Sequence, residues 1–220
     1  MLDYIIRKAT NKDINFIIEA IIEAEKSNTD KLPLSTLFDL TEEEVKKILF
    51  SILNEDIDGC EFSLSSFIVA EHNGKCVAAI GGWVEAMKEL SSAAIKANIF
   101  NYFMPSKNIQ HLNKLQNLIK DIQIERLPET YQLEYVYVKK EYRGNNLFTI
   151  LLNYHIEKSN SLEVYIQVFG NNKFAIKSYE KSGFEIYQIY HSNNKEINNY
   201  LPDDTKILMK LNRNKKWKKE

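Results

Sequence analysis

The chain has 220 residues, of which 44% are hydrophobic and 27% are charged, and its formal net charge is −1. This composition excludes a disordered chain, and the weak overall charge gives no reason to expect nucleic acid or an anionic membrane as the partner. The length suits one well-packed domain with an insertion, so we expect a single domain over residues 1–220. The two cysteines, Cys60 and Cys76, are too few for a zinc-finger cluster or a disulfide framework, and we expect no metal.

Segment 1–10 lacks the apolar core of a signal peptide, and no stretch approaches the roughly 18 uncharged apolar residues that a membrane span requires. A cytoplasmic protein is the simplest expectation. The basic run 213–219 is interpreted as a solvated tail, with an anionic partner as the alternative. The oligomeric state follows from no pattern in the sequence, and a homodimer stays open.

The apolar pattern near the N-terminus predicts two helices. Thr10, with Asp13 three residues later, is typical of a helix N-terminus, and that helix is expected to end near 27–28. After a loop through Pro33, Thr41 is expected to cap a second helix. The apolar faces of the two helices consist of Ile14, Ile17, Ile18, Ile21 and Ile22, and of Val45, Ile48, Leu49 and Ile52.

Three strands are predicted in the first half of the chain, at residues 4–7, 67–71 and 76–85. Asn73-Gly74 between the last two is a strong hairpin signal, because both central residues of a type I′ turn need positive φ. Gly81-Gly82 inside the third strand indicates a bulge or the close approach of another segment.

Residues 87–130 interrupt the strand pattern. An apolar, alanine-rich run from Ser91 to Phe103 ends at Pro105, and the leucines and isoleucines of 112–122 then recur at helical spacing. We therefore expect two helices inserted between strands.

The rest of the chain alternates strands and helices, which implies an α/β fold with a partly parallel sheet. The strands are expected at 131–139, 162–169, 184–190 and 205–211, and the helices at 146–158 and 173–181.

The first stretch of chemical interest is the turn Arg143-Gly144-Asn145-Asn146-Leu147-Phe148, through which a strand enters a helix. Such a turn presents consecutive backbone N–H groups at the positive end of a helix dipole, which suits a phosphate or pyrophosphate. Glycine and asparagine tolerate the left-handed conformations that this arrangement requires. Many turns of this kind bind nothing, so the turn alone identifies no ligand.

The second stretch covers residues 172–184. Ala175 and Tyr179 lie four residues apart on one helix face, and Gly183 stands where a helix end needs a left-handed residue. A short amphipathic helix with Tyr179 as a core aromatic explains this pattern by itself, so a catalytic Tyr179 needs further support.

Together the two stretches resemble the GNAT acetyltransferase superfamily. Its acyl-CoA signature, Gln/Arg-x-x-Gly-x-Gly/Ala, is matched by Arg143, with Asn146 and Phe148 in place of the two small residues. Its downstream signature, Asn-x-x-Ala-x-x-x-Tyr-x-x-x-Gly-Phe, is matched at every position from Asn172 to Phe184. Asparagine tolerates positive φ, whereas the phenylalanine either packs inward or crowds the diphosphate.

The resemblance implies a GNAT fold, with a mixed central sheet of about six to seven strands, flanking helices and the helical insertion at 87–130. It implies acetyl-CoA as co-substrate, with the pantetheine between two parting strands along Val136 and Val138. The diphosphate would lie on the N–H groups of residues 143–148, and Asn172 would be a further cofactor contact.

The resemblance also implies direct attack of an acceptor amine on the thioester, with Tyr179 as the acid that protonates the departing thiolate. For the base we choose Glu134, because strand alternation is expected to place it on the same face as Val136 and Val138. An ordinary solvated or ion-paired Glu134 is the alternative, and Glu85 is the other carboxylate expected to reach the site. We assign no role to any histidine.

Two other functions stay open from the sequence. One is a non-catalytic GNAT-like domain that binds acyl-CoA as a sensor. The other is an unrelated nucleotide-binding domain, although no Gly-x-Gly-x-x-Gly or Gly-x-x-x-x-Gly-Lys-Ser/Thr occurs. The acceptor is equally open between a small amine or amino acid, a peptide N-terminus and a lysine side chain. Residues 87–130 are expected to shape its pocket.

Overall fold

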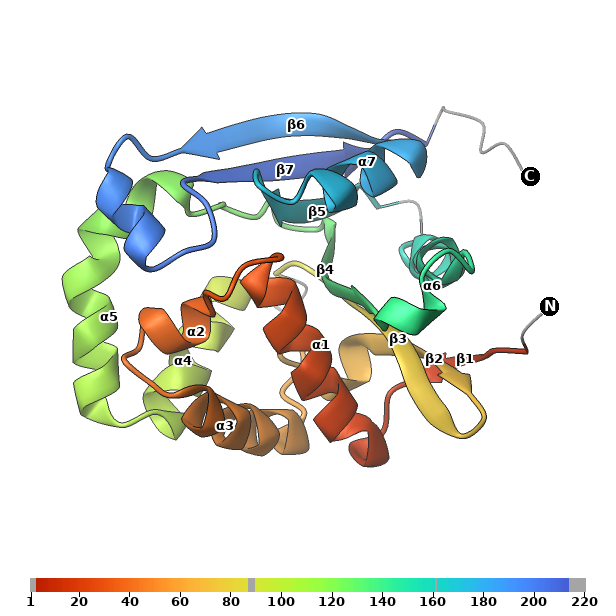
Figure 1. The fold of residues 1–220 in the computed structure, drawn as a ribbon, viewed down its shortest axis with the longest axis horizontal. Helices are drawn as coiled ribbons and strands as arrows, with labels where there is room; N and C mark the ends of the chain where they lie inside the picture. Colours follow the sequence, from red (N-terminus) through yellow and green to blue (C-terminus); the bar gives the residue numbers. More distant parts are fainter. Residues whose placement is uncertain (1–2, 87–89, 161, 214–220) are drawn as a thin grey trace.

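The computed structural model describes residues 3–86, 90–160 and 162–213, in which a seven-stranded sheet is flanked by helices (Figure 1). The strand order is β1-β2-β3-β4-β5-β7-β6. The pair β4–β5 is parallel and the other neighbouring pairs are antiparallel, which confirms the expected mixed sheet. The strands are β1 Ile5–Lys8, β2 Phe67–His72, β3 Lys75–Val84, β4 Tyr131–Val138, β5 Val164–Phe169, β6 Phe184–His191 and β7 Thr205–Leu211.

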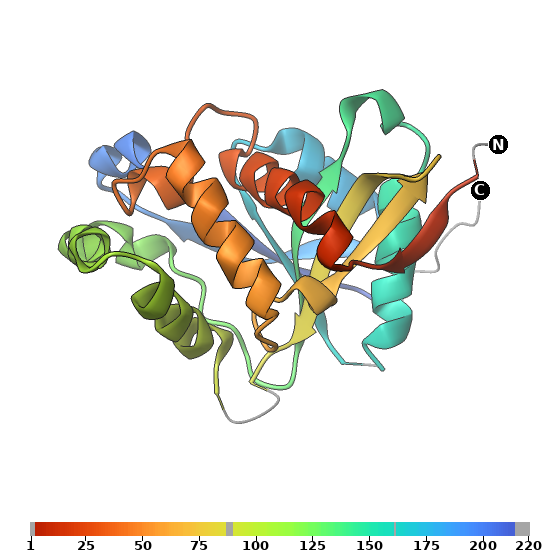
Figure 2. The ribbon, with the colours of Figure 1, turned by 90° about the horizontal axis from the view of Figure 1, so that it is seen from below.

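Helices cover both faces of this sheet. They are α1 Ile14–Lys26, α2 Pro33–Thr36, α3 Glu42–Glu55, α4 Ser92–Phe103, α5 Ser106–Ile119, α6 Leu147–Lys158 and α7 Lys173–Lys181. One apolar core lies between the sheet and α1 to α4, and a second lies under α6 and α7. Figure 2 shows α1 and α3 side by side. Within the described residues, no helix is both long and apolar enough to cross a membrane. Residues 214–220, most of the predicted basic tail, lie outside the described part.

The predicted helix starts are confirmed. The backbone N–H of Glu44 donates to the Thr41 hydroxyl over 3.2 Å, and that of Thr41 donates to the Glu44 carboxylate over 2.8 Å. A short 3-10 turn at 11–13 precedes α1. The helix α2 was not predicted, because Pro33 suggested a loop. Proline is in fact favoured at the first position of a helix, and four residues are too few to show helical periodicity.

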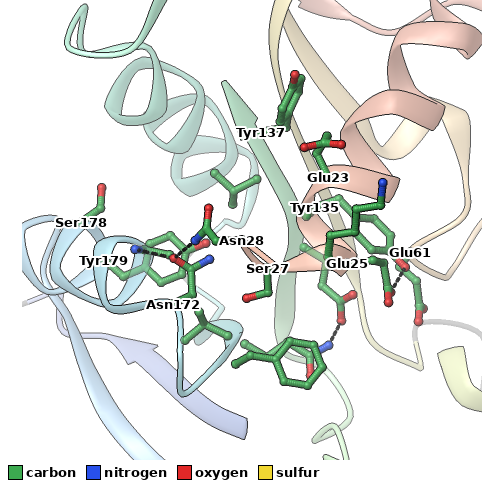
Figure 3. A pocket seen from close by; sticks show the side chains of 18 of the residues that line it. Glu23, Glu25, Ser27, Asn28, Glu61, Tyr135, Tyr137, Asn172, Ser178 and Tyr179 are labelled. Atoms are coloured by element: carbon green, nitrogen blue, oxygen red, sulfur yellow. Dashed lines mark hydrogen bonds between the residues drawn. The ribbon is translucent and has the colours of Figure 1, made fainter. Parts of the chain in front are cut away.

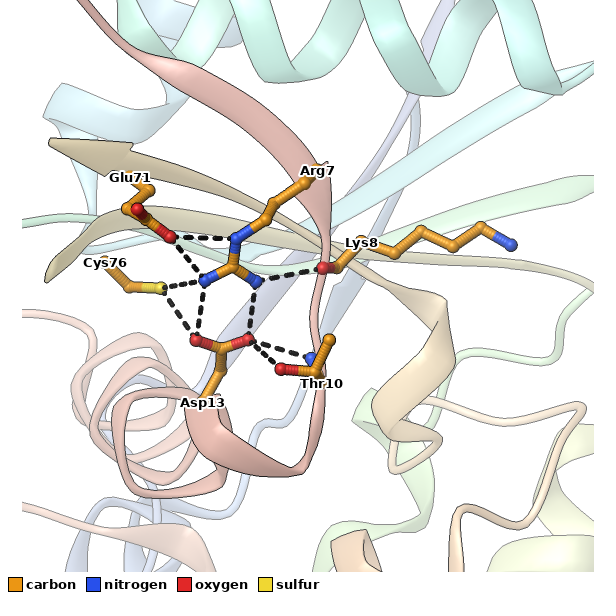
Figure 4. Close-up of polar contacts among 6 residues, drawn as sticks. All are labelled: Arg7, Lys8, Thr10, Asp13, Glu71 and Cys76. Atoms are coloured by element: carbon orange, nitrogen blue, oxygen red, sulfur yellow. Dashed lines mark hydrogen bonds and ion pairs between the residues drawn. The ribbon is translucent and has the colours of Figure 1, made fainter. Parts of the chain in front are cut away.

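A polar cluster joins β1 to the start of α1 and to the β2–β3 hairpin (Figure 4). The Arg7 guanidinium donates to Asp13 over 2.7 and 2.9 Å and to Glu71 over 2.7 and 2.9 Å. Burial opposes ionisation of Asp13, but Arg7 and the Cys76 thiol hold the pKa of this carboxyl well below its usual range. Burial, together with Asp13, raises the pKa of the Cys76 thiol to about 12. The cluster is therefore a structural clamp that contains a protonated thiol.

Both glycine predictions for the hairpin are confirmed. Asn73 and Gly74 have φ of 49° and 73°, as a type I′ turn requires. The pairing of β3 with β4 shifts register between Ala79 and Gly81. At Gly82, an added Cβ atom would lie 2.6 Å from Nδ1 of His155, so another segment does approach the backbone closely.

Candidate active site

The strands β4 and β5 part in the middle of the sheet. β4 pairs with β5 only through Tyr131, Gln132 and Leu133, whereas it pairs with β3 as far as Val138. Tyr135 has a φ of 55°, at the place where the β3 register shifts. On the side that faces β5, the backbone of 134–138 is consequently without a strand partner, and the gap passes through the sheet.

A cavity of about 1870 Å³ occupies this gap. Figure 3 shows Tyr179 and Asn172 on one side of it, and Glu25, Glu61 and Tyr135 on the other. Val136 and Val138 line it, as expected for residues beside a pantetheine arm. The cavity is therefore continuous from the turn before α6 to the helices of the inserted segment.

The turn before α6 has the predicted left-handed residues, since φ is 85° at Gly144 and 61° at Asn146. In the described part of the chain, the backbone N–H groups of 144–148 donate to no protein acceptor. Nε of Arg143 donates to the carbonyl of Val138 over 3.1 Å, which holds the side chain at the turn. Five consecutive free donors at the start of a twelve-residue helix form a site for an anion.

The ring of Phe148 packs inward against Tyr179, with ring centroids 5.4 Å apart. Phe148 is half-buried and also lines the cavity. Tyr179 is buried, and burial raises the pKa of its hydroxyl above the usual value. Among the described residues, its hydroxyl has no hydrogen-bond partner, although it lines the cavity.

Asn172 caps α7 and also joins the two sides of the cavity. Its Oδ1 accepts from the backbone N–H of Ala175 over 3.1 Å and from Nδ2 of Asn28 over 3.0 Å. The neighbouring Asn171 donates to the carbonyl of Ser27 over 3.1 Å. The end of α1 is thus fixed to the start of α7.

Comparison with known proteins identifies the family of this chain. The Acetyltransferase (GNAT) family matches residues 33–184, which include both the turn before α6 and the segment 172–184. This chain belongs to the GNAT acetyltransferase family. Members of the family use acetyl-CoA as co-substrate. No curated protein sequence matches the chain significantly.

Solved structures show the same fold. An N-acetyltransferase from Staphylococcus aureus Mu50 has a TM-score of 0.67 and 17% identity, covering 94% of this chain and 100% of that one. An agmatine N-acetyltransferase has a TM-score of 0.58 and 14% identity, covering 95% and 99%. Naa50 of Arabidopsis thaliana, in complex with a bisubstrate analogue containing CoA, has a TM-score of 0.51 and 14% identity, covering 95% and 93%. At these identities the likeness concerns the fold.

The alternation argument for Glu134 is wrong in this GNAT protein. Leu133 and Val136 both pack into the core under α6, and two residues instead of one stand between them. The bulge therefore turns Glu134 and Tyr135 to the opposite face, that of α1 and α3. There Glu134 is buried and lines the cavity, and it accepts hydrogen bonds from Arg126 and Gln167.

Glu85 does not reach the cavity. Its carboxylate accepts from Nε1 of Trp83 over 3.2 Å and from the backbone N–H of Ser92 over 2.8 Å. Glu85 is buried and accepts the hydrogen bond of a backbone N–H at the start of α4. The expectation that it reaches the site is therefore wrong. His155 is buried as well, between the Tyr131 hydroxyl and the carbonyl of Ile80.

Sequence reasoning missed four charged residues that line the cavity: Glu25, Glu61, Lys96 and Lys206. Burial raises the pKa of Glu25 to about 7, with Lys206 opposing the shift and Glu134 adding to it. The Tyr135 hydroxyl donates to Glu25 over 3.4 Å. Glu61 is paired with Lys96 over 2.5 Å. No local motif marks any of them, because they meet only when α1, the turn around Glu61, α4 and β7 converge.

The inserted helices form the far end of the cavity. Phe100 is buried there, with its ring 5.0 Å from that of Phe38 and 5.4 Å from that of Phe62. Tyr102 instead is 83% exposed, so these two aromatics of α4 differ in their surroundings from each other. Further lining residues from the segment 87–130 are Leu112, Gln116, Ile119, Ile122 and Gln123.

Proposed function

We propose that this protein transfers an acetyl group from acetyl-CoA to an amine. The observation that carries this proposal is the row of free N–H groups at 144–148, which opens into the same cavity as the Tyr179 hydroxyl. An anion site at one end of a continuous cavity and an unpaired phenol in its middle fit a co-substrate with a diphosphate and a thioester.

In the proposed complex the diphosphate accepts from the N–H groups of 144–148, and Arg143 adds positive charge. The pantetheine lies along Val136 and Val138, whose backbone lacks a partner on the β5 side. Asn172 has its Oδ1 occupied by Ala175 and Asn28, so its amide donors are the group free to contact the cofactor. The thioester then lies near the bulge at Tyr135.

The reaction we propose is a direct attack of the neutral amine nitrogen on the thioester carbon. The new C–N bond forms, the C–S bond breaks, and the products are an amide and CoA. Tyr179 gives its proton to the departing thiolate, and its raised pKa keeps it protonated at neutral pH. The proton from the amine passes to a carboxylate on the opposite side of the cavity.

Two carboxylates compete for the role of base. Glu134, chosen from the sequence, is engaged by Arg126 and Gln167, both of which donate to its Oε1. Glu25 has no ion-pair partner among the described residues, and its pKa of about 7 suits proton transfer near neutral pH. We therefore propose Glu25 as the base, and we assign Glu134 to orienting Arg126 and Gln167.

The proposal is tested by two measurements on the same protein. Calorimetry with CoA and acetyl-CoA is expected to show binding, and thiol release from acetyl-CoA is expected to depend on an added amine. Binding without thiol release across a broad panel of amines and peptides would instead support the non-catalytic acyl-CoA sensor. Absence of binding would overturn both.

A further inference from the structure

We propose that the acceptor is an amino acid with an apolar side chain, whose carboxylate binds Lys206 while its amine lies at Glu25. This inference rests on the proposed acetyl transfer and names the substrate class for the same site. Its basis is a pair of opposite charges in the cavity wall that do not satisfy each other.

Lys206, at the start of β7, is a cavity-lining cation that has no carboxylate partner among the described residues. It lines the cavity with its ammonium 4.9 Å from the centre of the Phe169 ring. In the described part of the chain, it has no carboxylate within 4.0 Å and no hydrogen-bond acceptor. The neighbouring cations Lys96 and Arg126 do have carboxylate partners. An ammonium with unfilled donors in a partly dry cavity favours an anionic ligand.

Glu25 lines the same cavity as Lys206. Apart from the cost of burial, the strongest influence on the pKa of each group is the charge of the other. Their charged atoms nevertheless lie beyond ion-pair distance. An ammonium and a carboxylate that line one cavity without forming an ion pair match the two ends of a zwitterion. In this orientation the acceptor nitrogen lies beside the group that we propose as its base.

The anion is a carboxylate rather than a phosphate, because Lys206 offers one positive charge and the neighbouring Lys96 and Arg126 are already paired with carboxylates. Glu25 and Glu134 both influence the pKa of Lys206, and their negative charges disfavour a dianion at this place. A monoanion balances the free lysine without leaving excess negative charge.

The remaining residues of the cavity wall indicate which kind of side chain the acceptor carries. The rings of Phe38, Phe62 and Phe100 pack together at the far end, so the wall beyond the charges is apolar. In the same wall Oε2 of Glu61 has no hydrogen-bond partner among the described residues, although this side chain is 2% exposed. It provides an acceptor for a second N–H of the ligand.

The test compares matched acceptors that differ only in the anion. The probes are L-phenylalanine, L-phenylalaninamide and 2-phenylethylamine, with L-leucine, L-leucinamide and 3-methylbutylamine as an aliphatic set. We expect the amino acids to exceed the amide and the amine in kcat/KM by about tenfold or more, because the analogues without a carboxylate leave Lys206 without a partner.

The variant Lys206→Met keeps the length of the side chain and removes the charge. Its preference for the amino acid is expected to fall to within about twofold of unity, with CoA affinity by calorimetry as the check on folding. The matched control is Lys210→Met, on the same face of β7, where the lysine is paired with Glu163. This control should keep the preference.

The outcomes separate the two proposals. Thiol release with equal use of amino acids and amines, or a preference that survives Lys206→Met, overturns the acceptor inference and leaves acetyl transfer standing. Reaction with peptides or simple amines but with no amino acid in either set overturns it as well. Failure of thiol release with every acceptor overturns the proposed function itself.

Discussion

The ring of Phe148 packs on the ring of Tyr179, with 5.4 Å between their centroids. One residue belongs to the turn at the start of α6 and the other to α7, so the contact joins the anion site to the proposed acid. A phenylalanine at a position that the family signature reserves for a small residue thus supports the tyrosine from the side.

Replacing Tyr179 by phenylalanine tests the role of its hydroxyl. Tyr179→Phe keeps the ring and its contacts with Phe148 and Phe184, and it removes only the proton donor. We expect kcat to fall by about a hundredfold or more, with the dissociation constant of CoA unchanged in calorimetry. Turnover close to that of the wild type would return Tyr179 to a purely structural role.

Charge reversal at Arg143 tests the anion site. Arg143→Glu places a negative charge beside the turn 144–148, and we expect the dissociation constant of CoA to rise by about tenfold or more at low salt. The matched control is Lys47→Glu, which changes the charge equally at an exposed position on α3 outside the cavity. Equal affinity in the two variants would move the diphosphate away from this turn.

The pH profile distinguishes the two candidate bases. Glu25 is protonated below its pKa of about 7, so kcat/KM should rise as the pH rises through this value. Glu25→Gln should remove this limb and lower the rate by about a hundredfold, whereas Glu134→Gln should keep the limb. Should the limb vanish in Glu134→Gln and persist in Glu25→Gln, the base is Glu134.

Two aromatic residues of α4, Phe100 and Tyr102, test the role of the inserted segment. Phe100 lines the cavity and Tyr102 points away from it, so Phe100→Leu should raise the Michaelis constant of the acceptor by about tenfold while Tyr102→Ala leaves it unchanged. CoA affinity serves as the control for both. If acceptor kinetics are intact in Phe100→Leu and Tyr102→Ala converts a dimer to a monomer in sedimentation, this segment is an interface instead.

Stability should fall in mild acid because of His155. Burial lowers the pKa of its imidazole to about 4, whereas the unfolded chain has the ordinary value of 6.5. Between these values the unfolded state binds more protons, so stability is complete above about pH 6.5 and decreases as the pH falls to 4. The contribution is on the order of 3 kcal/mol. Thermal unfolding of His155→Gln, which does not titrate, should show a weaker pH dependence over this range, and an unchanged dependence would exclude His155 as its cause.

The sequence by itself determined most of the secondary structure and the left-handed turn before α6, because both depend on neighbours along the chain. The helix cap at Thr41, the turn at Asn73-Gly74 and the left-handed residues Gly144 and Asn146 follow from local backbone and side-chain chemistry. The family signature rests on equally local spacing, as in Asn172 to Phe184.

Only the tertiary structure decided which carboxylates and cations meet. Because of the bulge at Tyr135, Glu134 lies on the opposite face of the sheet from Val136. Alternation along the sequence does not reveal such a bulge. Glu25 and Lys206 come from α1 and β7, and they line one cavity because the sheet brings both ends of the chain to it. Their altered pKa values arise from burial and from each other's charge, which are properties of the folded protein and not of either segment alone.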